Sequence, residues 1–224
     1  MARKVPVFVA GFAAGLIVVA WLRLQSGSTG IVGTLSGYAT LFYVGITIAA
    51  AFLFVRAGIP LRGLGFGPPQ RPLLYLAFAA AGVALLQLSG LILEPIWEQL
   101  FGSGRDLTRF ADVTGSTSQL IAMLAFSWTV AAFGEELAFR ILLMRSVAFA
   151  LGDSRVAFAC ALIVQAMIFG LVHVYQGPAG IAGTVTSGLI YGGLTLLGRG
   201  SIWPAALAHG FNNTIGLLTI YAGG

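Results

Sequence analysis

The polar residues of this chain that could carry out hydrolysis lie inside apolar stretches. Glu135 and Glu136 are adjacent within one long apolar segment, and Arg140 follows four residues after Glu136. The chain has only two histidines, His173 and His209, and each lies in a later apolar segment. A carboxylate can activate water as a general base, and an imidazole can share the proton or stabilise an oxyanion. An ionisable group in hydrocarbon is costly, so these positions indicate a functional or paired role.

The spacing of these residues indicates which of them share a helix face. Residues at i and i+4 are neighbours on a helix, so Glu136 and Arg140 can pair. His209 and Asn213 have the same spacing and can point at one spot. Phe169 precedes His173 by four residues, so its ring could orient the imidazole. Taken singly, the acid and the cation could be a structural ion pair, a lone histidine could be a hydrogen-bonded core group, and Asn213 could link helices.

The composition predicts a membrane protein. Of 224 residues, 58% are hydrophobic and only 8% are charged, whereas an ordinary soluble domain carries about 25% charged residues. So few charges exclude the soluble globular, disordered and collagen-like classes. The single cysteine, Cys160, excludes a disulfide framework and a cysteine-rich metal site. The net charge of +5 comes from arginines at span ends, so we expect a lipid bilayer as partner and no nucleic acid.

The apolar segments predict an all-α, polytopic transmembrane helix bundle with an intramembrane polar cavity. A span needs roughly 20 apolar residues, and seven segments qualify, or eight if one of them splits. They are residues 5–22, 31–55, 72–93, 119–151, 156–175, 179–197 and 202–221. We expect one integral membrane domain over 1–224, with N-terminal helices and a loop in 1–118 and a catalytic core in 119–216. Residues 96–101 are amphipathic enough to lie at the membrane interface.

The distribution of basic residues predicts an orientation in the cell membrane. Eight basic residues fall in loops on the N-terminal side and three on the opposite side. The first group is Arg3, Lys4, Arg56, Arg62, Arg71, Arg145, Arg155 and Arg199, and the second is Arg23, Arg105 and Arg109. The positive-inside rule then places the N-terminus in the cytoplasm.

Helix rise tests whether three helices can bring the polar residues together. Counted from the turn at 152–154, Glu135 lies about 26 Å and His173 about 29 Å into the membrane at 1.5 Å per residue. Counted from Gly200, His209 lies only about 14 Å deep, which is roughly 12 Å short of the others. Tilt, or one turn projecting beyond the other, would be needed to close this gap.

Three short motifs resemble those of a known family. Residues 135–140 match EExxxR, residues 169–173 match FxxxH, and residues 209–213 match HxxxN. In order and helix placement they resemble the CPBP family, the CAAX protease and bacteriocin-processing intramembrane proteases, also called ABI or Rce1-like. The resemblance covers about residues 119–214, while the first three spans contribute only hydropathy.

The resemblance implies a glutamate-dependent intramembrane peptidase, often described as a metalloprotease, acting on a membrane-associated peptide or protein. It implies that Glu135 activates water with help from His173, and that Glu136 and Arg140 support the site. It also implies that His209 and Asn213 stabilise the oxyanion. The family that the motifs resemble also includes members proposed to act as scaffolds or immunity proteins.

Two questions stay open at this level. Glu135, His173 and His209 could bind a divalent metal such as zinc, or the same residues could act without a metal. The chain could also be a proton-coupled transporter that uses Glu135 and His173 as a relay, or a catalytically silent membrane scaffold. Internal repeats, which transporters often show, are not visible in the sequence.

Overall fold

Helices form the whole framework of the computed structural model, which describes residues 5–26 and 28–223, and these residues contain no β-strand. The helices are α1 (Val5–Leu24), α2 (Gly30–Gly37), α3 (Ala39–Arg56), α4 (Pro72–Phe101), α5 (Thr117–Phe126), α6 (Arg145–Ala150), α7 (Arg155–Leu171), α8 (Gly177–Leu197) and α9 (Trp203–Tyr221). The all-α class predicted from the sequence is confirmed.

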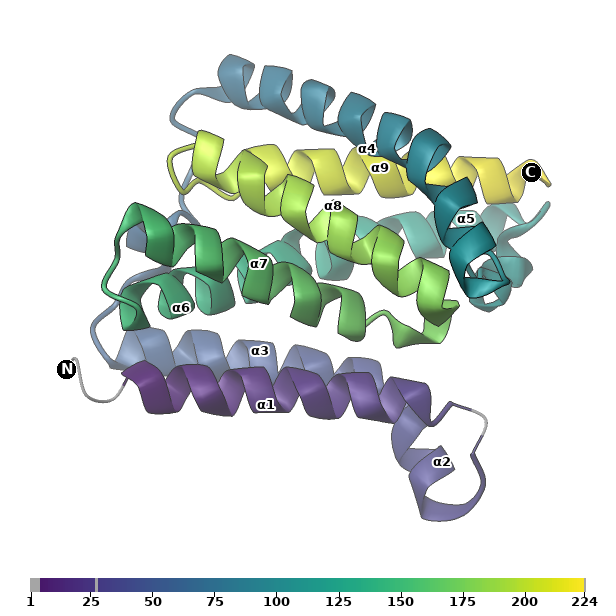
Figure 1. Ribbon diagram of the computed structural model, residues 1–224, viewed down its shortest axis with the longest axis horizontal. Helices are drawn as coiled ribbons and strands as arrows, with labels where there is room; N and C mark the ends of the chain where they lie inside the picture. The colour runs from purple at the N-terminus through teal and green to yellow at the C-terminus, as the bar shows by residue number, and fades with distance from the viewer. Residues whose placement is uncertain (1–4, 27, 224) are drawn as a thin grey trace.

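The helices pack side by side in a bundle whose long members run roughly along one axis (Figure 1). α1 and α3 form a pair along one edge, α7 packs against α8, and α4 packs against both α8 and α9. Small residues permit the close approach of α7 and α8, since a Cβ at Gly188 would lie 3.0 Å from the Cα of Ala166. Close backbone contact of this kind is a usual source of helix association in membranes.

The segment that carries both adjacent glutamates is one long rod of 34 residues, Thr117–Ala150. Between α5 and α6 its backbone is π-helical over Ser127–Glu135 and Leu137–Met144. The wider turns of a π-helix are rare in proteins, and those that occur are often found at functional sites. The predicted segment 119–151 is therefore present, and its π-helical character was not predictable from apolar periodicity.

Two predicted spans have different ends in the structure. The span predicted at 31–55 is broken at Tyr38 into α2 and α3, and α2 turns away from the axis of α3 (Figure 1). Glycines begin and end α2, and glycine is a poor helix former. The span predicted at 72–93 continues to Phe101 through Pro95. The helix ends only at Gly102, where φ is +74°.

The apolar helices make the chain a multi-pass membrane protein. Four helices in the described residues are long and apolar enough to cross a membrane, namely Ala39–Arg56, Pro72–Phe101, Thr117–Ala150 and Val174–Leu197. The apolar stretches Phe8–Leu24 and Arg155–Leu171 are shorter. Large apolar side chains such as Leu73 (83% exposed) and Leu91 (77% exposed) cover the outer surface, where lipid would surround them. The count of seven or eight spans remains a prediction.

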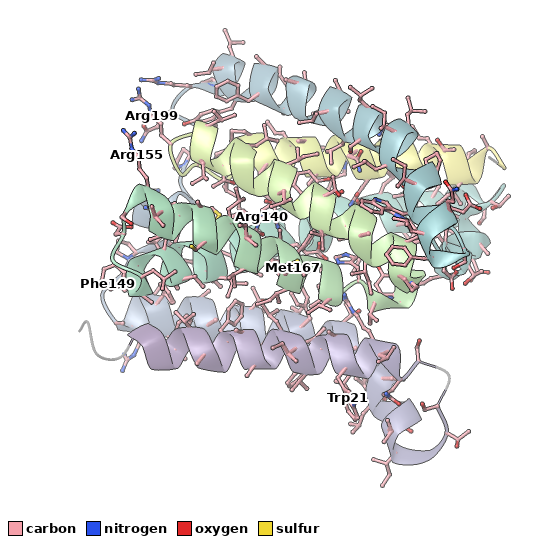
Figure 2. The ribbon with its side chains drawn as sticks, viewed as in Figure 1. Trp21, Arg140, Phe149, Arg155, Met167 and Arg199 are labelled. Carbon is pink, nitrogen blue, oxygen red and sulfur yellow. The ribbon has the colours of Figure 1, made fainter. Side chains whose placement is uncertain are left out.

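The placement of arginines corrects one part of the predicted orientation. Arg155 and Arg199 lie at the same end of the bundle, and Arg140 lies within it (Figure 2). Arg23, which we predicted to lie in a loop on the opposite side, is instead buried within α1. Arg23 lies in the last turn of α1, so its exposure differs from the prediction but its side does not, and a cytoplasmic N-terminus remains a prediction.

Candidate active site

Three separate segments bring their polar side chains to one place in the bundle. Glu135 Oε2 lies 3.9 Å from Nε2 of His173 and 3.9 Å from Nε2 of His209. Glu136 Oε1 lies 2.9 Å from Nδ1 of His209, and Glu136 Oε2 lies 3.0 Å from Nε of Arg140. These five residues are called the polar cluster below.

The π-helical rod supplies three members of the polar cluster, Glu135, Glu136 and Arg140. The side chains of Glu136 and Arg140 are completely buried, and Glu135 is nearly so. The Arg140 guanidinium is close to the Glu136 carboxylate, but its N–H bonds are not directed at the oxygens. The contact is therefore an ion pair without a well-aligned hydrogen bond, as the i and i+4 spacing predicts.

Aromatic rings occupy the remaining surroundings of Arg140 and His209. The Arg140 guanidinium lies 4.6 Å from the ring centroid of Phe169 and 5.3 Å from that of Tyr191. Tyr191 stacks on the His209 imidazole with centroids 4.6 Å apart and an angle of 15°. A guanidinium over an aromatic face is stabilised by cation–π attraction. Sequence reasoning missed Tyr191, because a single tyrosine in an apolar segment carries no motif.

We predicted that His173 lies inside a span. In the structure it lies in the turn that follows α7. The helix ends at Leu171, and Nδ1 of His173 donates a hydrogen bond to the carbonyl oxygen of Phe169 at 2.7 Å. That carbonyl belongs to the last helical turn, where carbonyls lack intrahelical partners. The Phe169 ring also lies edge-on to His173, with centroids 4.8 Å apart. Phe169 therefore orients the imidazole through its backbone as well as through its ring.

The hydrogen-bond partners of the two histidines fix which nitrogen faces Glu135. A carbonyl and a carboxylate oxygen accept hydrogen bonds, so Nδ1 of both imidazoles carries the proton. In the neutral rings, Nε2 is then an acceptor, and both Nε2 atoms face Glu135 Oε2. That carboxylate oxygen is buried and has no hydrogen-bond partner in the described part of the chain. A gap of 3.9 Å is too long for a direct hydrogen bond and suits a bridging water.

The register of the helices explains how His209 reaches the depth of Glu135. Ile141 packs against Ile202 at the beginning of α9, and Arg145 approaches Gly200 in the turn before it. The turn between α8 and α9 therefore lies beside Arg145, seven residues before Gly152. Seven helical residues correspond to about 10 Å. The turn at 152–154 thus projects beyond the turn at Gly200, and this projection accounts for most of the 12 Å gap expected from helix rise.

Asn213 lies one helical turn beyond His209 on α9 and is half-buried. Among the described residues it has no hydrogen bond through its side chain. Its neighbour Asn212 accepts a hydrogen bond from Gln87 of α4 at 2.9 Å. The spacing leaves Asn213 on the same face of α9 as His209, and its predicted role toward an oxyanion remains a prediction.

Arg23 approaches the polar cluster from α1, and sequence reasoning had assigned it to a loop. Its Nη1 donates a hydrogen bond to the carbonyl oxygen of Val172 at 2.6 Å, directly before His173. The guanidinium lies 6.0 Å from the ring centroid of Tyr43 and 5.5 Å from that of Tyr175. An arginine near the end of an apolar stretch resembles an interfacial anchor in the sequence, so its burial became visible only in the structure.

The donor set predicted for a metal does not have metal-site geometry. Zinc bonds of about 2.0–2.1 Å in a tetrahedral site place ligand atoms about 3.4 Å apart. The two distances from Glu135 Oε2 to the imidazole nitrogens are both 3.9 Å. Within 5–26 and 28–223, no group of three His, Cys, Asp or Glu side chains is arranged to hold a metal ion. Glu135, His173 and His209 thus do not fit zinc in this arrangement.

Two hollows on the surface of the bundle do not coincide with the predicted polar cavity. One hollow of about 260 Å³ lies between α1 and α3 and is lined by apolar side chains. Another lies along the last turns of α9, from Ile215 to Gly223. Neither includes a member of the polar cluster, so a cavity open to substrate remains a prediction.

Comparison with known proteins supports the resemblance seen in the motifs. Residues 117–215 match the family model described as type II CAAX prenyl endopeptidase Rce1-like. Searches of curated proteins and of solved structures gave no match. The matched residues contain all three motifs, and the geometry above brings two glutamates, both histidines and Arg140 of those motifs together. Residues 117–215 therefore match the Rce1-like CAAX protease family that the motifs predicted.

Proposed function

We propose that the protein is an intramembrane, glutamate-dependent endopeptidase that hydrolyses a peptide bond in a membrane-associated peptide or protein. The family of the domain supports a peptidase. The observation that carries the proposal is the position of Glu135 Oε2, 3.9 Å from the Nε2 atoms of both His173 and His209. A water molecule bound between these three acceptors would be held close to a base.

In this proposal Glu135 is the general base. A water in this space donates one hydrogen to Glu135 and the other to Nε2 of His173, which leaves an oxygen lone pair for the peptide carbonyl carbon. As the C–O bond forms, Glu135 takes the proton and the carbonyl oxygen becomes an oxyanion. The proton then passes to the leaving amine as the C–N bond breaks. Positioned proton transfer of this kind contributes about 10²- to 10⁴-fold to a rate.

His209 has the partners needed to stabilise negative charge. Its Nδ1–H donates to the Glu136 carboxylate at 2.9 Å, and an ionised carboxylate on Nδ1 stabilises the imidazolium that forms when Nε2 takes a proton. The other oxygen of that carboxylate lies 3.0 Å from Nε of Arg140, so the group that accepts from His209 also contacts a cation. We propose that Nε2 of His209 receives the water's proton from Glu135 as the oxyanion forms, so that this new N–H, together with the carboxamide of Asn213, stabilises the oxyanion until the proton passes to the leaving amine.

His173 is proposed to hold the water and to share its proton. Its Nδ1 is occupied by the Phe169 carbonyl, so only Nε2 is available on the side of Glu135. Because no set of three His, Cys, Asp or Glu residues in the described part of the chain fits a metal ion, the steps proposed here use only the protein's own side chains. The metal-free version of the predicted chemistry is thus the one that the geometry supports.

A cleavage assay tests the proposal. Wild type, Glu135→Gln and a control, Glu98→Gln, would be reconstituted into lipid vesicles and given lipidated and unlipidated membrane peptides. Glu98 is an exposed acid on α4, so the control removes an acid without touching the polar cluster. We expect wild type and Glu98→Gln to cleave a peptide and Glu135→Gln to lose at least 100-fold in kcat, in line with the loss of a general base, about 10²- to 10⁴-fold.

Cleavage by Glu135→Gln at the wild-type rate would contradict the proposal. A wild type that cleaves none of the peptides, but moves protons across the vesicle membrane in a Glu135-dependent way, would favour a transporter instead.

A further inference from the structure

The buried charges of the Rce1-like domain do not balance. With neutral imidazoles, the polar cluster holds two carboxylates, Glu135 and Glu136, and one guanidinium, Arg140. Arg140 pairs with Glu136 at 3.0 Å, so the charge of Glu135 is left over. An uncompensated charge inside a membrane-embedded bundle is energetically unfavourable. A cation from outside the matched residues would remove this cost.

Arg23 is a buried cation with no acid of its own. It is 9% exposed, and a guanidinium is always protonated in proteins. Among the described residues, no carboxylate lies within ion-pair distance of Arg23, while its guanidinium contacts the carbonyl oxygen of Val172, directly before the His173 whose Nε2 lies 3.9 Å from Glu135. Its Nε atom is buried without a hydrogen-bond partner. Arg23 belongs to α1, which lies outside residues 117–215.

The contact between Arg23 and Val172 connects α1 to the segment that carries His173. The Val172 carbonyl lies just beyond the end of α7, where carbonyl groups lack helical partners and the helix dipole favours a positive charge. The Arg23 Nη1 hydrogen bond of 2.6 Å satisfies this carbonyl. Hydrogen bonds to charged groups are stronger than neutral ones. The backbone of the residue next to His173 is thus held by the first helix of the chain.

We propose that Arg23 is a positioning residue of the candidate active site, which fixes the turn bearing His173 and supplies the positive charge that balances Glu135. The N-terminal helices are then a working part of the site and not only a membrane anchor. The catalytic half of this inference rests on the proposed function, whereas the charge balance can be tested without any activity.

A double-mutant cycle on stability tests the charge balance. Thermal unfolding would be measured for wild type, Arg23→Gln, Glu135→Gln and the double variant in the same detergent and lipid. We expect Arg23→Gln to lower Tm by several degrees, and Glu135→Gln to restore part of that loss when it is added. Arg23→Lys keeps the charge and should unfold closer to wild type than Arg23→Gln does.

A matched control uses Arg56, an exposed arginine at the end of α3. Arg56→Gln and Glu135→Gln should change Tm additively, because the two residues share no partner. Additive behaviour of Arg23→Gln and Glu135→Gln would overturn the charge balance. If Arg23→Gln cannot be purified folded, the double variant should be recoverable, and its failure to fold would count against the proposal.

A kinetic measurement tests the positioning of His173. We expect Arg23→Gln to lower kcat more than 10-fold with a smaller change in KM, since the turn that bears the imidazole is displaced while the outer surface is unchanged. Arg23→Lys should recover most of the loss, and Arg56→Gln should match wild type. Unchanged kcat in Arg23→Gln, beside an inactive Glu135→Gln, would refute the positioning role and leave the proposed function intact.

Discussion

Replacing Glu136 by glutamine separates the structural and the catalytic consequences of the buried ion pair. The Glu136 carboxylate contacts Arg140 Nε at 3.0 Å and His209 Nδ1 at 2.9 Å, and the side chains of Glu136 and Arg140 are fully buried. A glutamine has nearly the same shape, and its amide oxygen can still accept from Nδ1. The change therefore removes the negative charge and leaves the volume almost unchanged.

The expected loss of stability follows from the burial of Arg140. Breaking a buried ion pair by removing one partner costs about 3–5 kcal/mol, because the other charge is left uncompensated. Adding Arg140→Met removes that charge and fills the space among Phe169 and Tyr191 with an apolar side chain. The double variant Glu136→Gln/Arg140→Met should therefore regain most of the stability that Glu136→Gln loses.

Activity should not return with stability. Without a carboxylate on Nδ1, a protonated His209 is no longer stabilised, and loss of the carboxylate beside a catalytic imidazole lowers kcat by up to about 10⁴-fold. Both Glu136→Gln and the double variant should show this loss in a vesicle cleavage assay, while thermal unfolding shows recovery only in the double variant. Wild-type kcat in the stable double variant would refute the role given to Glu136.

Three further predictions follow from the same geometry. Tyr191→Phe should keep more than half of wild-type kcat, whereas Tyr191→Leu should lose about 10-fold because the ring stacked on His209 is gone; equal loss in both would contradict the stacking role. Treatment with a strong chelator should leave kcat unchanged, since Glu135, His173 and His209 do not fit a metal ion; loss of activity that zinc restores would contradict this. Gly170→Val should lower the free energy of unfolding by about 1–3 kcal/mol, because its Cβ would overlap Val185 of α8, and a wild-type Tm would show that the helices do not pack as described.

The parts of the site that could be predicted from the sequence are those set by spacing along one helix. The pairing of Glu136 with Arg140 follows from residues four apart, and the structure has it at 3.0 Å. The motif order also identified the family, which the domain match confirms. Helix rise predicted similar depths for Glu135 and His173, and the structure has their side chains 3.9 Å apart.

Features that depend on contacts between segments could not be predicted in this way. Ile141 packs against Ile202, and this contact makes the turn at Gly152 project beyond the turn at Gly200. The hydrophobic periodicity of the sequence does not encode such a contact. The end of α7 at Leu171 escaped prediction because Val172 and His173 continue an apolar run without a helix-breaking residue.

Buried residues outside the motifs were the hardest to find. Arg23 lies more than 100 positions from Val172 in the chain, and only the fold shows the hydrogen bond between them. Tyr191 likewise contacts His209 through the packing of α8 on α9. For the N-terminal helices, the sequence predicted only hydropathy, and the structure adds a contact with the segment that carries His173.

The most direct test of the central claim is an experimental structure of the protein in a lipid nanodisc, at a resolution that shows ordered water. Our account predicts one water in the space between Glu135 Oε2 and the two imidazoles, at hydrogen-bond distances of about 2.6–3.2 Å from Glu135 Oε2 and from Nε2 of His173. Density bonded to all three atoms at about 2.0–2.1 Å would indicate a metal and contradict the metal-free mechanism. Side chains that point apart toward lipid would contradict the site itself.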